Sequence, residues 1–353
     1  MPQTLLSVSN LKVSFKTDDA YFTAVDDVSF DIRRGEIVGL VGESGCGKSV
    51  SALSLLRLIP SPPGRIENGR VLFKGNDLLT AGIETVRKIR GKEIGMIFQE
   101  PLSALSPLQR IGRQMVETIR IHRQTPKSGA WQMSLEWLGK VNIPDAAEKM
   151  HAYPYQLSGG MQQRIMIAMA LMMNPELIIA DEPTTALDVT IQAQVFQLIR
   201  EMKAEHTSIL LITHDMGVVW EMCDRVLVMY ASRIVEEGRM EDIFSAPSHP
   251  YTYSLLKSIP TLSNGKGNRL AVIPGSVPSP ENYPSGCRFR DRCPFAFEKC
   301  RTQMPELVPV SDNHRAACFI AGKFRNSHKH SAVSRKKWRV GGLKGLRELI
   351  ATS

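Results

Sequence analysis

The sequence predicts an α/β fold, and three observations carry the prediction. Short apolar runs, typical of buried strands, alternate with segments of helical periodicity through about the first 240 residues. This alternation favours a largely parallel sheet with helical crossovers. Hydrophobic residues make up 43% of the 353-residue chain and charged residues 22%, so a core of ordinary size can form. Beyond about residue 245, prolines and glycines interrupt the pattern, which indicates a separate appendage.

The expected elements follow in chain order. Each expected strand is a short apolar run: Glu36–Val41, Ile94–Phe98, Leu177–Asp181, Ser208–Thr213 and Arg225–Met229. Helical patterns cover Lys48–Ile59, Gly159–Met173 and Val189–Ala204, and Pro60 is expected to end the first of them. Residues 102–155 are helical in pattern without a strong strand. Together with the helix that follows, they predict a helical insertion over about residues 102–172.

Apolar patterning and charge limit the classes of protein that fit. The longest strongly apolar stretch, Ile165–Met173, is shorter than the roughly 18 residues that a membrane span needs. The N-terminus lacks the features of a signal peptide. We therefore expect a cytosolic protein whose role at a membrane, if it has one, depends on partners.

The net charge of +9 is concentrated at one end of the chain. Residues 321–353 contain nine Lys or Arg against one acid, so this segment carries eight of the nine charges. The remaining residues are nearly neutral, which argues against a nucleic-acid partner. We expect 321–353 to be a flexible basic tail, with contact to anionic lipid as the alternative.

One glycine-rich segment has the pattern of a phosphate-binding loop. Gly42-Glu-Ser-Gly-Cys-Gly-Lys-Ser49 fits G-x-x-x-x-G-K-[ST] between an expected strand and an expected helix. Glycines let backbone N–H groups converge on phosphate oxygens, and the helix start adds a positive end. Lys48 is expected to neutralise the β- and γ-phosphates of ATP, and Ser49 to ligate Mg²⁺. The expected ATP contacts are Gly42, Glu43, Ser44, Gly45, Cys46, Gly47, Lys48 and Ser49.

A second pattern follows about 130 residues downstream. The strand Leu177–Asp181 ends in an acid and is followed directly by Glu182. In enzymes with this loop, an acid at the end of such a strand holds the magnesium shell, which assigns Asp181 to Mg²⁺. Glu182 would then polarise the attacking water as general base. Acids that end strands also cap helices, so the assignment depends on the presence of the phosphate loop.

A third motif narrows the family. Leu157-Ser-Gly-Gly-Met161, followed by Gln162-Gln163-Arg164, resembles the signature motif of ABC transporters. Ser158 occupies an expected N-cap, so the motif forms an anion-binding helix end. The resemblance implies a P-loop ABC ATPase domain with a mixed sheet. It also implies that Ser158, Gly159 and Gly160 cover the γ-phosphate bound to a partner subunit in a head-to-tail dimer.

Other positions match motifs of the same family in order. Gln99 resembles the glutamine that senses Mg²⁺ and the attacking water, and it precedes the insertion that contacts the permease. Asp188 resembles the aspartate of the loop that crosses the dimer interface. His214 resembles the histidine that stabilises charge at the γ-phosphate. Phe15 lies where the family places an aromatic ring against adenine, with Tyr21 or Phe22 as alternatives.

The C-terminal region resembles the dipeptide/oligopeptide ATP-binding subunits. The segments that carry the likeness are His249-Pro-Tyr-Thr252, Ile273-Pro-Gly-Ser-Val-Pro278 and Gly286-Cys-Arg-Phe-Arg-Asp-Arg-Cys-Pro294. That branch also serves nickel, glutathione and antimicrobial-peptide systems. The resemblance implies two membrane permeases, a second homologous ATPase and an extracytoplasmic binding protein, at the cytoplasmic face of the inner membrane. We expect an ATPase domain over 1–245 and an appendage over 246–320.

Four cysteines crowd into the appendage. Cys287, Cys293, Cys300 and Cys318 have the spacing C-x5-C-x6-C-x17-C. Four thiolates suit a [4Fe–4S] cluster, and several members of the branch resemble this arrangement. Zinc is the main alternative, although its ligands usually come in closer pairs, and disulfides come third in a reducing cytosol.

Three other classes of ATPase share some of these motifs. ATPases of DNA repair need a long coiled coil between the motifs, and this chain has none. Ribosome-binding relatives usually carry two cassettes, and here each motif occurs once. Exporters usually fuse ATPase and permease. The sequence therefore favours an ATP-hydrolysing subunit of an importer, most simply for di- or oligopeptides.

Overall fold

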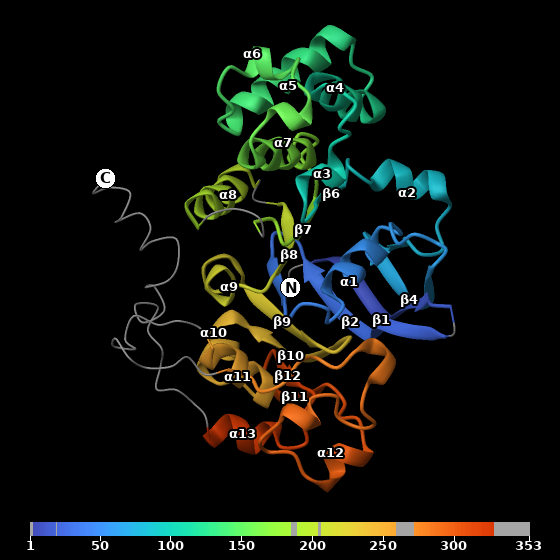
Figure 1. Ribbon diagram of the computed structural model, residues 1–353, viewed down its shortest axis with the longest axis vertical. Helices are drawn as coiled ribbons and strands as arrows, with labels where there is room; N and C mark the ends of the chain where they lie inside the picture. Colours follow the sequence, from blue (N-terminus) through green and yellow to red (C-terminus); the bar gives the residue numbers. More distant parts are fainter. Residues whose placement is uncertain (1–2, 19, 185–188, 204–205, 259–271, 328–353) are drawn as a thin grey trace, which may run out of the picture. The chain divides into compact units, whose positions relative to one another are not determined.

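The computed structural model describes residues 3–18, 20–184, 189–203, 206–258 and 272–327. These residues divide into two compact units, one formed by 1–80 and 212–353 and the other by 81–211. Within the described residues no helix is long and apolar enough to cross a membrane. Figure 1 shows the helices and strands of both units.

The first unit contains an antiparallel sheet of four strands in the order β2-β1-β4-β5. Its strands are β1 (Thr4–Lys16), β2 (Tyr21–Arg33), β4 (Gly64–Phe73) and β5 (Asn76–Asp77). The sequence patterns did not predict these strands. Register shifts interrupt the pairing of β1 with β2 and with β4, and such irregularities break the alternation by which a half-buried strand is recognised.

The strands of the eight-stranded sheet that lie in this unit have the order β11-β12-β10-β9-β3. β3 (Ile37–Val41) pairs in parallel with β9 (Arg225–Tyr230), and both are almost fully buried. β10 (Arg233–Arg239), β12 (His314–Ala316) and β11 (Val308–Ser311) continue it in antiparallel pairs. The sheet is therefore mixed, and the strands near its centre are the ones that the apolar runs predicted.

Helices of the first unit follow these strands. α1 (Lys48–Leu55) follows β3 after the loop 42–47. The helices of the C-terminal part of this unit include α9 (Met216–Met222), α10 (Met240–Ser245) and α11 (Pro250–Lys257). α1 is shorter than predicted. It ends before Arg57, whose positive φ of 53° is incompatible with a continuing right-handed helix.

The C-terminal segment packs within the first unit (Figure 1, orange to red). It contains the short helices η2 (Pro280–Asn282), η3 (Arg290–Arg292), α12 (Glu298–Thr302) and α13 (Ala321–Ser327). Its strand β12 extends the central sheet at β10, and the buried carboxylate of Glu236 accepts a 2.7 Å hydrogen bond from His314 Nε2. Of the expected basic tail, 321–327 are helical, and 328–353 lie outside the described residues.

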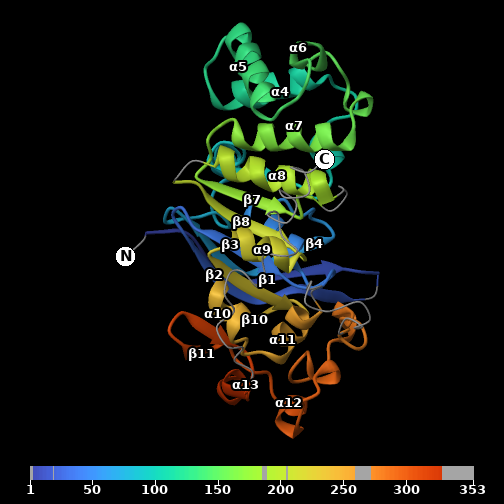
Figure 2. The same ribbon diagram turned by 90° about the vertical axis from the view of Figure 1, so that its left-hand side faces the viewer.

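The second unit contains the predicted helical segment and three buried strands. The strands β6 (Ile94–Ile97), β7 (Leu177–Asp181) and β8 (Ser208–Thr213) have the order β8-β7-β6, and β8 continues into the first unit. The helices are α2 (Ile83–Ile89), α3 (Pro101–Ala104), α4 (Ile111–His122), α5 (Lys127–Lys140), α6 (Ala146–Lys149), α7 (Gly159–Leu171) and α8 (Val189–Met202), with η1 (Pro154–Gln156) before α7. In Figures 1 and 2, α4, α5 and α6 form one helical group next to α7.

Candidate active site

The phosphate loop connects β3 to α1, as its sequence context predicted. Gly42 and Gly47 have φ values of 156° and 105°. A Cβ atom on Gly42 would lie 2.1 Å from the carbonyl oxygen of Met229, and one on Gly47 would lie 2.3 Å from that of Ala24. Both positions therefore require glycine, because no side chain fits between the loop and the strands beneath it.

Lys48 lies across this loop and is only 4% exposed. Its ammonium group donates to the carbonyl oxygens of Gly42 at 2.9 Å and Glu43 at 3.1 Å. No side chain caps the start of α1, which leaves that helix end suited to an anion. Cys46 belongs to the loop and is fully buried, and this burial raises the pKa of its thiol. Cys46 is therefore a neutral packing residue.

Glu43 is held from two sides by the C-terminal part of the same unit. Its backbone N–H donates to the hydroxyl of Tyr251 at 3.0 Å. Its carboxylate pairs with Arg292 through two hydrogen bonds of 3.0 Å each. Burial lowers the pKa of Arg292, but its hydrogen bonds to Glu43 and Tyr230 and the charge of Glu43 raise that pKa above its usual value. Sequence reasoning missed both contacts, although Tyr251 and Arg292 belong to segments that it had marked.

Two other predicted residues also lie in the first unit. His214 is exposed, just after β8. The next residue, Asp215, caps α9 by accepting the backbone N–H groups of Gly217 and Val218. Phe15 is partly buried at the end of β1 and stacks on Phe22, with ring centroids 5.7 Å apart. The geometry of this pair does not distinguish Phe15 from Phe22, and the adenine contact expected of Phe15 stays a prediction.

In the second unit, two of the predicted catalytic side chains meet. The amide nitrogen of Gln99 lies 3.4 Å from a carboxylate oxygen of Glu182. Asp181 is 5% exposed at the end of β7, and Glu182 has a positive φ of 42°. Gln163 of α7 donates to the carbonyl oxygen of Pro183. This bond ties the segment after β7 to the helix of the signature motif.

The signature motif begins α7 as its sequence predicted. Ser158 is the N-cap, and its hydroxyl accepts the backbone N–H of Met161 at 3.3 Å. Gly159 and Gly160 are the first residues of the helix, and Ser158 and Gly159 are exposed. The remaining predicted contact, Asp188, lies outside the described residues.

The four C-terminal cysteines line one small cavity of the first unit, about 20 Å³ in volume. Aromatic and proline side chains, among them Phe289 and Phe319, also line the cavity. Burial raises the pKa of Cys293 to about 11 and that of Cys318 to about 12, and the neighbouring thiols add to the rise. No three His, Cys, Asp or Glu side chains among the described residues lie close enough to bind one metal ion. The chain thus gathers the cysteines, but not into a site for a single ion.

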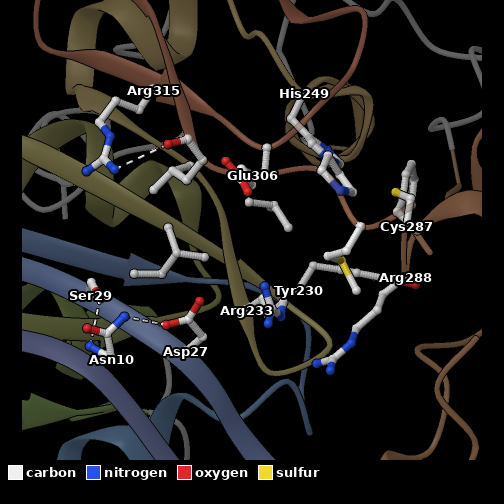
Figure 3. Close-up of a pocket in the computed structure, with 17 residues that line it drawn as sticks. Asn10, Asp27, Ser29, Tyr230, Arg233, His249, Cys287, Arg288, Glu306 and Arg315 are labelled. Carbon is white, nitrogen blue, oxygen red and sulfur yellow. Dashed lines mark hydrogen bonds between the residues drawn. The ribbon is translucent and has the colours of Figure 1, made fainter. Parts of the chain in front are cut away.

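A larger pocket of about 330 Å³ lies beside this cavity (Figure 3). Asn10 and Asp27 form one wall and share a 2.7 Å hydrogen bond, while Arg315 lies on another wall. Cys287 and His249 line both the pocket and the cysteine cavity. Of the residues of the pocket, the sequence motifs had marked His249 and the run Cys287, Arg288 and Phe289.

Comparison with known proteins identifies two segments. Residues 25–185 match the family model described as ABC transporter, and residues 235–300 match the model described as Oligopeptide/dipeptide transporter, C-terminal region. The chain is 47% identical over 323 residues to "Probable peptide ABC transporter ATP-binding protein y4tR" of Sinorhizobium fredii, covering 91% of this chain and 96% of that protein. It is 48% identical over 318 residues to "Oligopeptide transport ATP-binding protein AppD" of Bacillus subtilis, covering 90% and 97%.

A solved structure agrees with these relatives. A dimeric ATP-binding cassette in a post-hydrolysis state, bound to ADP and Pi, is similar with a TM-score of 0.60 and 26% identity, over 67% of this chain and 98% of that chain. The predicted α/β fold and the resemblance in the sequence motifs are both confirmed. The chain therefore belongs to the ABC transporter family, among its ATP-binding proteins.

Proposed function

We propose that this protein is the ATP-hydrolysing subunit of a membrane importer for di- or oligopeptides. The observation that carries the proposal is the pairing of a strand–loop–helix phosphate site with the C-terminal segment 235–300 of the oligopeptide/dipeptide type. The names of the relatives in Sinorhizobium fredii and Bacillus subtilis support peptides as the cargo. Nickel, glutathione and antimicrobial peptides are the alternative cargoes.

ATP with Mg²⁺ is the ligand pair expected for this family. We assign the phosphates to the loop 42–49, where Lys48 already lies across the loop carbonyls. Ser49, Gln99 and Asp181 offer a hydroxyl, an amide and a carboxylate oxygen, the donor types that Mg²⁺ prefers. The bound ion would neutralise developing charge on the phosphates. Phe15 is assigned to the adenine ring.

Hydrolysis in this proposal is attack of water on the γ-phosphate. Glu182 accepts the proton of the attacking water. The amide of Gln99, 3.4 Å from that carboxylate, orients the same water molecule. His214 stabilises the charge that develops on the γ-phosphate. Ser158, Gly159, Gly160 and Asp188 act on the nucleotide of a second, homologous subunit, and the capped start of α7 supports this use as an anion site. The similar cassette was solved as a dimer.

The second unit offers the surface that we assign to the permeases. Leu108 is 87% exposed and Ile121 is 69% exposed, both in or beside the helical segment. A groove of about 760 Å³ lies next to Ile121 and is lined by cationic and aromatic side chains, including Arg113 and Trp131. We assign this face to the permeases because the resemblance in the sequence places the permease contact in the helical insertion. Two permeases and an extracytoplasmic binding protein complete the proposed complex, at the cytoplasmic face of the inner membrane.

We also propose a division of the chain into three parts. We assign 1–245 to the ATPase domain with its helical insertion at about 102–172, 246–320 to the appendage, and 321–353 to the basic tail. In this arrangement the appendage closes the edge of the central sheet through β12. It also contacts the phosphate loop through Tyr251 and Arg292.

We further propose that Cys287, Cys293, Cys300 and Cys318 hold a [4Fe–4S] cluster. The gathering of all four thiols around one cavity supports this assignment, since each thiolate of a cluster binds a different iron. Zinc is the alternative, since it also takes four cysteine ligands. Iron, zinc and sulfide should be measured on protein purified without oxygen. About four irons per chain would support the cluster, whereas one zinc or no metal would overturn it.

Peptide import is tested in cells that carry the chromosomal transporter genes. Replacement of the wild-type gene by the Lys48→Ala variant should abolish uptake of a labelled tripeptide, because the phosphates lose their cation. Uptake of nickel should remain unchanged. Loss of nickel uptake with normal peptide uptake would overturn the peptide assignment while leaving the ATPase role intact.

A further inference from the structure

The phosphate loop contains an acid at its second position. The carboxylate of Glu43 is 29% exposed, in the same loop that we assign to the nucleotide phosphates. The negative charge of a carboxylate in a phosphate-binding loop opposes nucleotide binding unless that charge is compensated. The cation that lies across the loop, Lys48, donates to the backbone carbonyls of Gly42 and Glu43.

Arg292 compensates the charge of Glu43 in the described structure. Its two terminal nitrogens each donate to a different carboxylate oxygen at 3.0 Å, which is the bidentate geometry of a strong ion pair. The Arg292 side chain is only 6% exposed, so solvent screens the pair weakly. Its Nε also donates to the carbonyl oxygen of Pro274 at 2.8 Å, which fixes the plane of the guanidinium group.

The segment that carries Arg292 also carries two of the clustered cysteines. Arg292 ends η3 and directly precedes Cys293. At the other end of this segment, Arg288 follows Cys287 and donates to Asp26 and to the carbonyl oxygen of Ala231. The segment 287–293 is therefore bonded at both ends to the part of the unit that surrounds the phosphate loop.

A second set of contacts connects the segment 287–293 to the phosphate loop. The residue after Ala231, Ser232, donates its backbone N–H to the carbonyl oxygen of Cys46 in the phosphate loop at 2.9 Å. Arg288 thus fixes the turn that supports one part of the loop, while Arg292 holds the side chain at another. Both contacts lie within the first unit.

We propose that Arg292 is a positioning residue for nucleotide binding, which neutralises Glu43 and makes nucleotide affinity depend on the cysteine segment 287–293. The role rests on the proposed binding of ATP at the loop 42–49. It assigns the C-terminal cysteine region a direct effect on the nucleotide site, beyond holding its own fold. Any change that displaces Cys293 would move Arg292 and expose the charge of Glu43 to the phosphates.

The test is calorimetric titration of the purified full chain with Mg-ADP. Arg292→Ala is expected to bind ADP about tenfold more weakly than the wild type, which corresponds to about 1.4 kcal/mol. Adding Glu43→Gln to Arg292→Ala should recover most of that loss, because the uncompensated charge is removed. The loss should also shrink at high salt, which screens the exposed carboxylate.

Arg290→Ala is the matched control. Arg290 lies in the same helix η3, and its hydrogen bonds among the described residues go to Ser285, Asp291 and Arg301. This variant should bind ADP within about twofold of the wild type. If Arg292→Ala fails to fold, Arg292→Lys serves instead, with a smaller loss that Glu43→Gln again relieves.

Two results would overturn the proposed role. Binding of ADP by Arg292→Ala as tightly as by the wild type would exclude the role of Arg292, and a double variant no better than Arg292→Ala would exclude charge compensation. Failure of the wild-type chain to bind ADP would instead overturn the assignment of the nucleotide site, and the role of Arg292 with it.

Discussion

The hydroxyl of Tyr251 accepts the backbone N–H of Glu43 at 3.0 Å, so the first turn of α11 supports the start of the phosphate loop. Local sequence explains why this turn is in place. His249 caps α11 by accepting the N–H of Tyr251 on its Nδ1 at 3.0 Å, and burial lowers the pKa of His249 to about 4, which keeps the ring neutral. Pro250 suits the first helical position, since its missing N–H is not needed there.

Tyr251→Phe is expected to destabilise the chain by roughly 1–3 kcal/mol, since the partly buried N–H of Glu43 loses its acceptor while the ring packing is kept. Urea unfolding measures the change. Tyr155→Phe is the control, because that tyrosine is 69% exposed and should shift stability by less than about 0.5 kcal/mol. Equal stability of the two variants would contradict the supporting role of the Tyr251 hydroxyl.

The patterns that predicted the fold correctly belong to buried, regular elements. Leu177–Asp181 and Ser208–Thr213 have the predicted bounds, since both strands are fully buried and each contains an unbroken run of four apolar residues. The phosphate loop and the signature motif were predictable for another reason. Their glycines and capping serine are fixed by local backbone geometry, which a short segment of sequence specifies on its own.

Contacts between distant segments were not predictable in this way. Arg292 meets Glu43 across 249 residues, and Tyr251 meets the same residue across 208. No periodicity links such positions, because the pairing depends on how the C-terminal segment returns to the sheet. Strand β12 was missed for the same reason: its three residues become a strand only by pairing with β10 and β11.

Glu36→Gln is expected to reduce stability at neutral pH by about 2 kcal/mol, because the carboxylate bonds Arg225 at 2.9 Å and the N–H of Arg33 at 2.9 Å. Burial raises the pKa of Glu36, but these partners outweigh it and hold the pKa below its ordinary value of 4.5. A lowered folded-state pKa stabilises the fold above pH 4.5, and that contribution is lost as the pH falls below it.

The measurement for Glu36 is urea unfolding of wild type and Glu36→Gln between neutral pH and pH values below 4.5. The stability difference between them should be constant at neutral pH and shrink on acidification. Glu84→Gln is the control, since the Glu84–Arg87 pair is exposed and contributes little. A stability difference that grows as the pH falls would contradict a lowered pKa of Glu36 in the folded state.

Ser158→Ala is expected to remove the N-cap of α7, which costs the helix about 1 kcal/mol, and to weaken ATP-driven pairing of subunits. Sedimentation of the chain with and without Mg-ATP, in a hydrolysis-deficient background, measures the pairing. Ser134→Ala provides a control, because that hydroxyl bonds only the carbonyl oxygen of Ala130 within α5. Unaltered pairing in Ser158→Ala would argue against a partner-facing signature motif.

Glu182→Gln tests most directly whether Glu182 activates the water that cleaves ATP. Gln99 lies 3.4 Å from the Glu182 carboxylate, and an amide at position 182 keeps the size of the side chain but cannot accept the proton. Phosphate release and Mg-ATP binding should be measured on the same preparation of the full chain. We expect binding to persist while turnover falls by about 100-fold or more. Turnover close to that of the wild type would contradict the assignment of Glu182 as the general base.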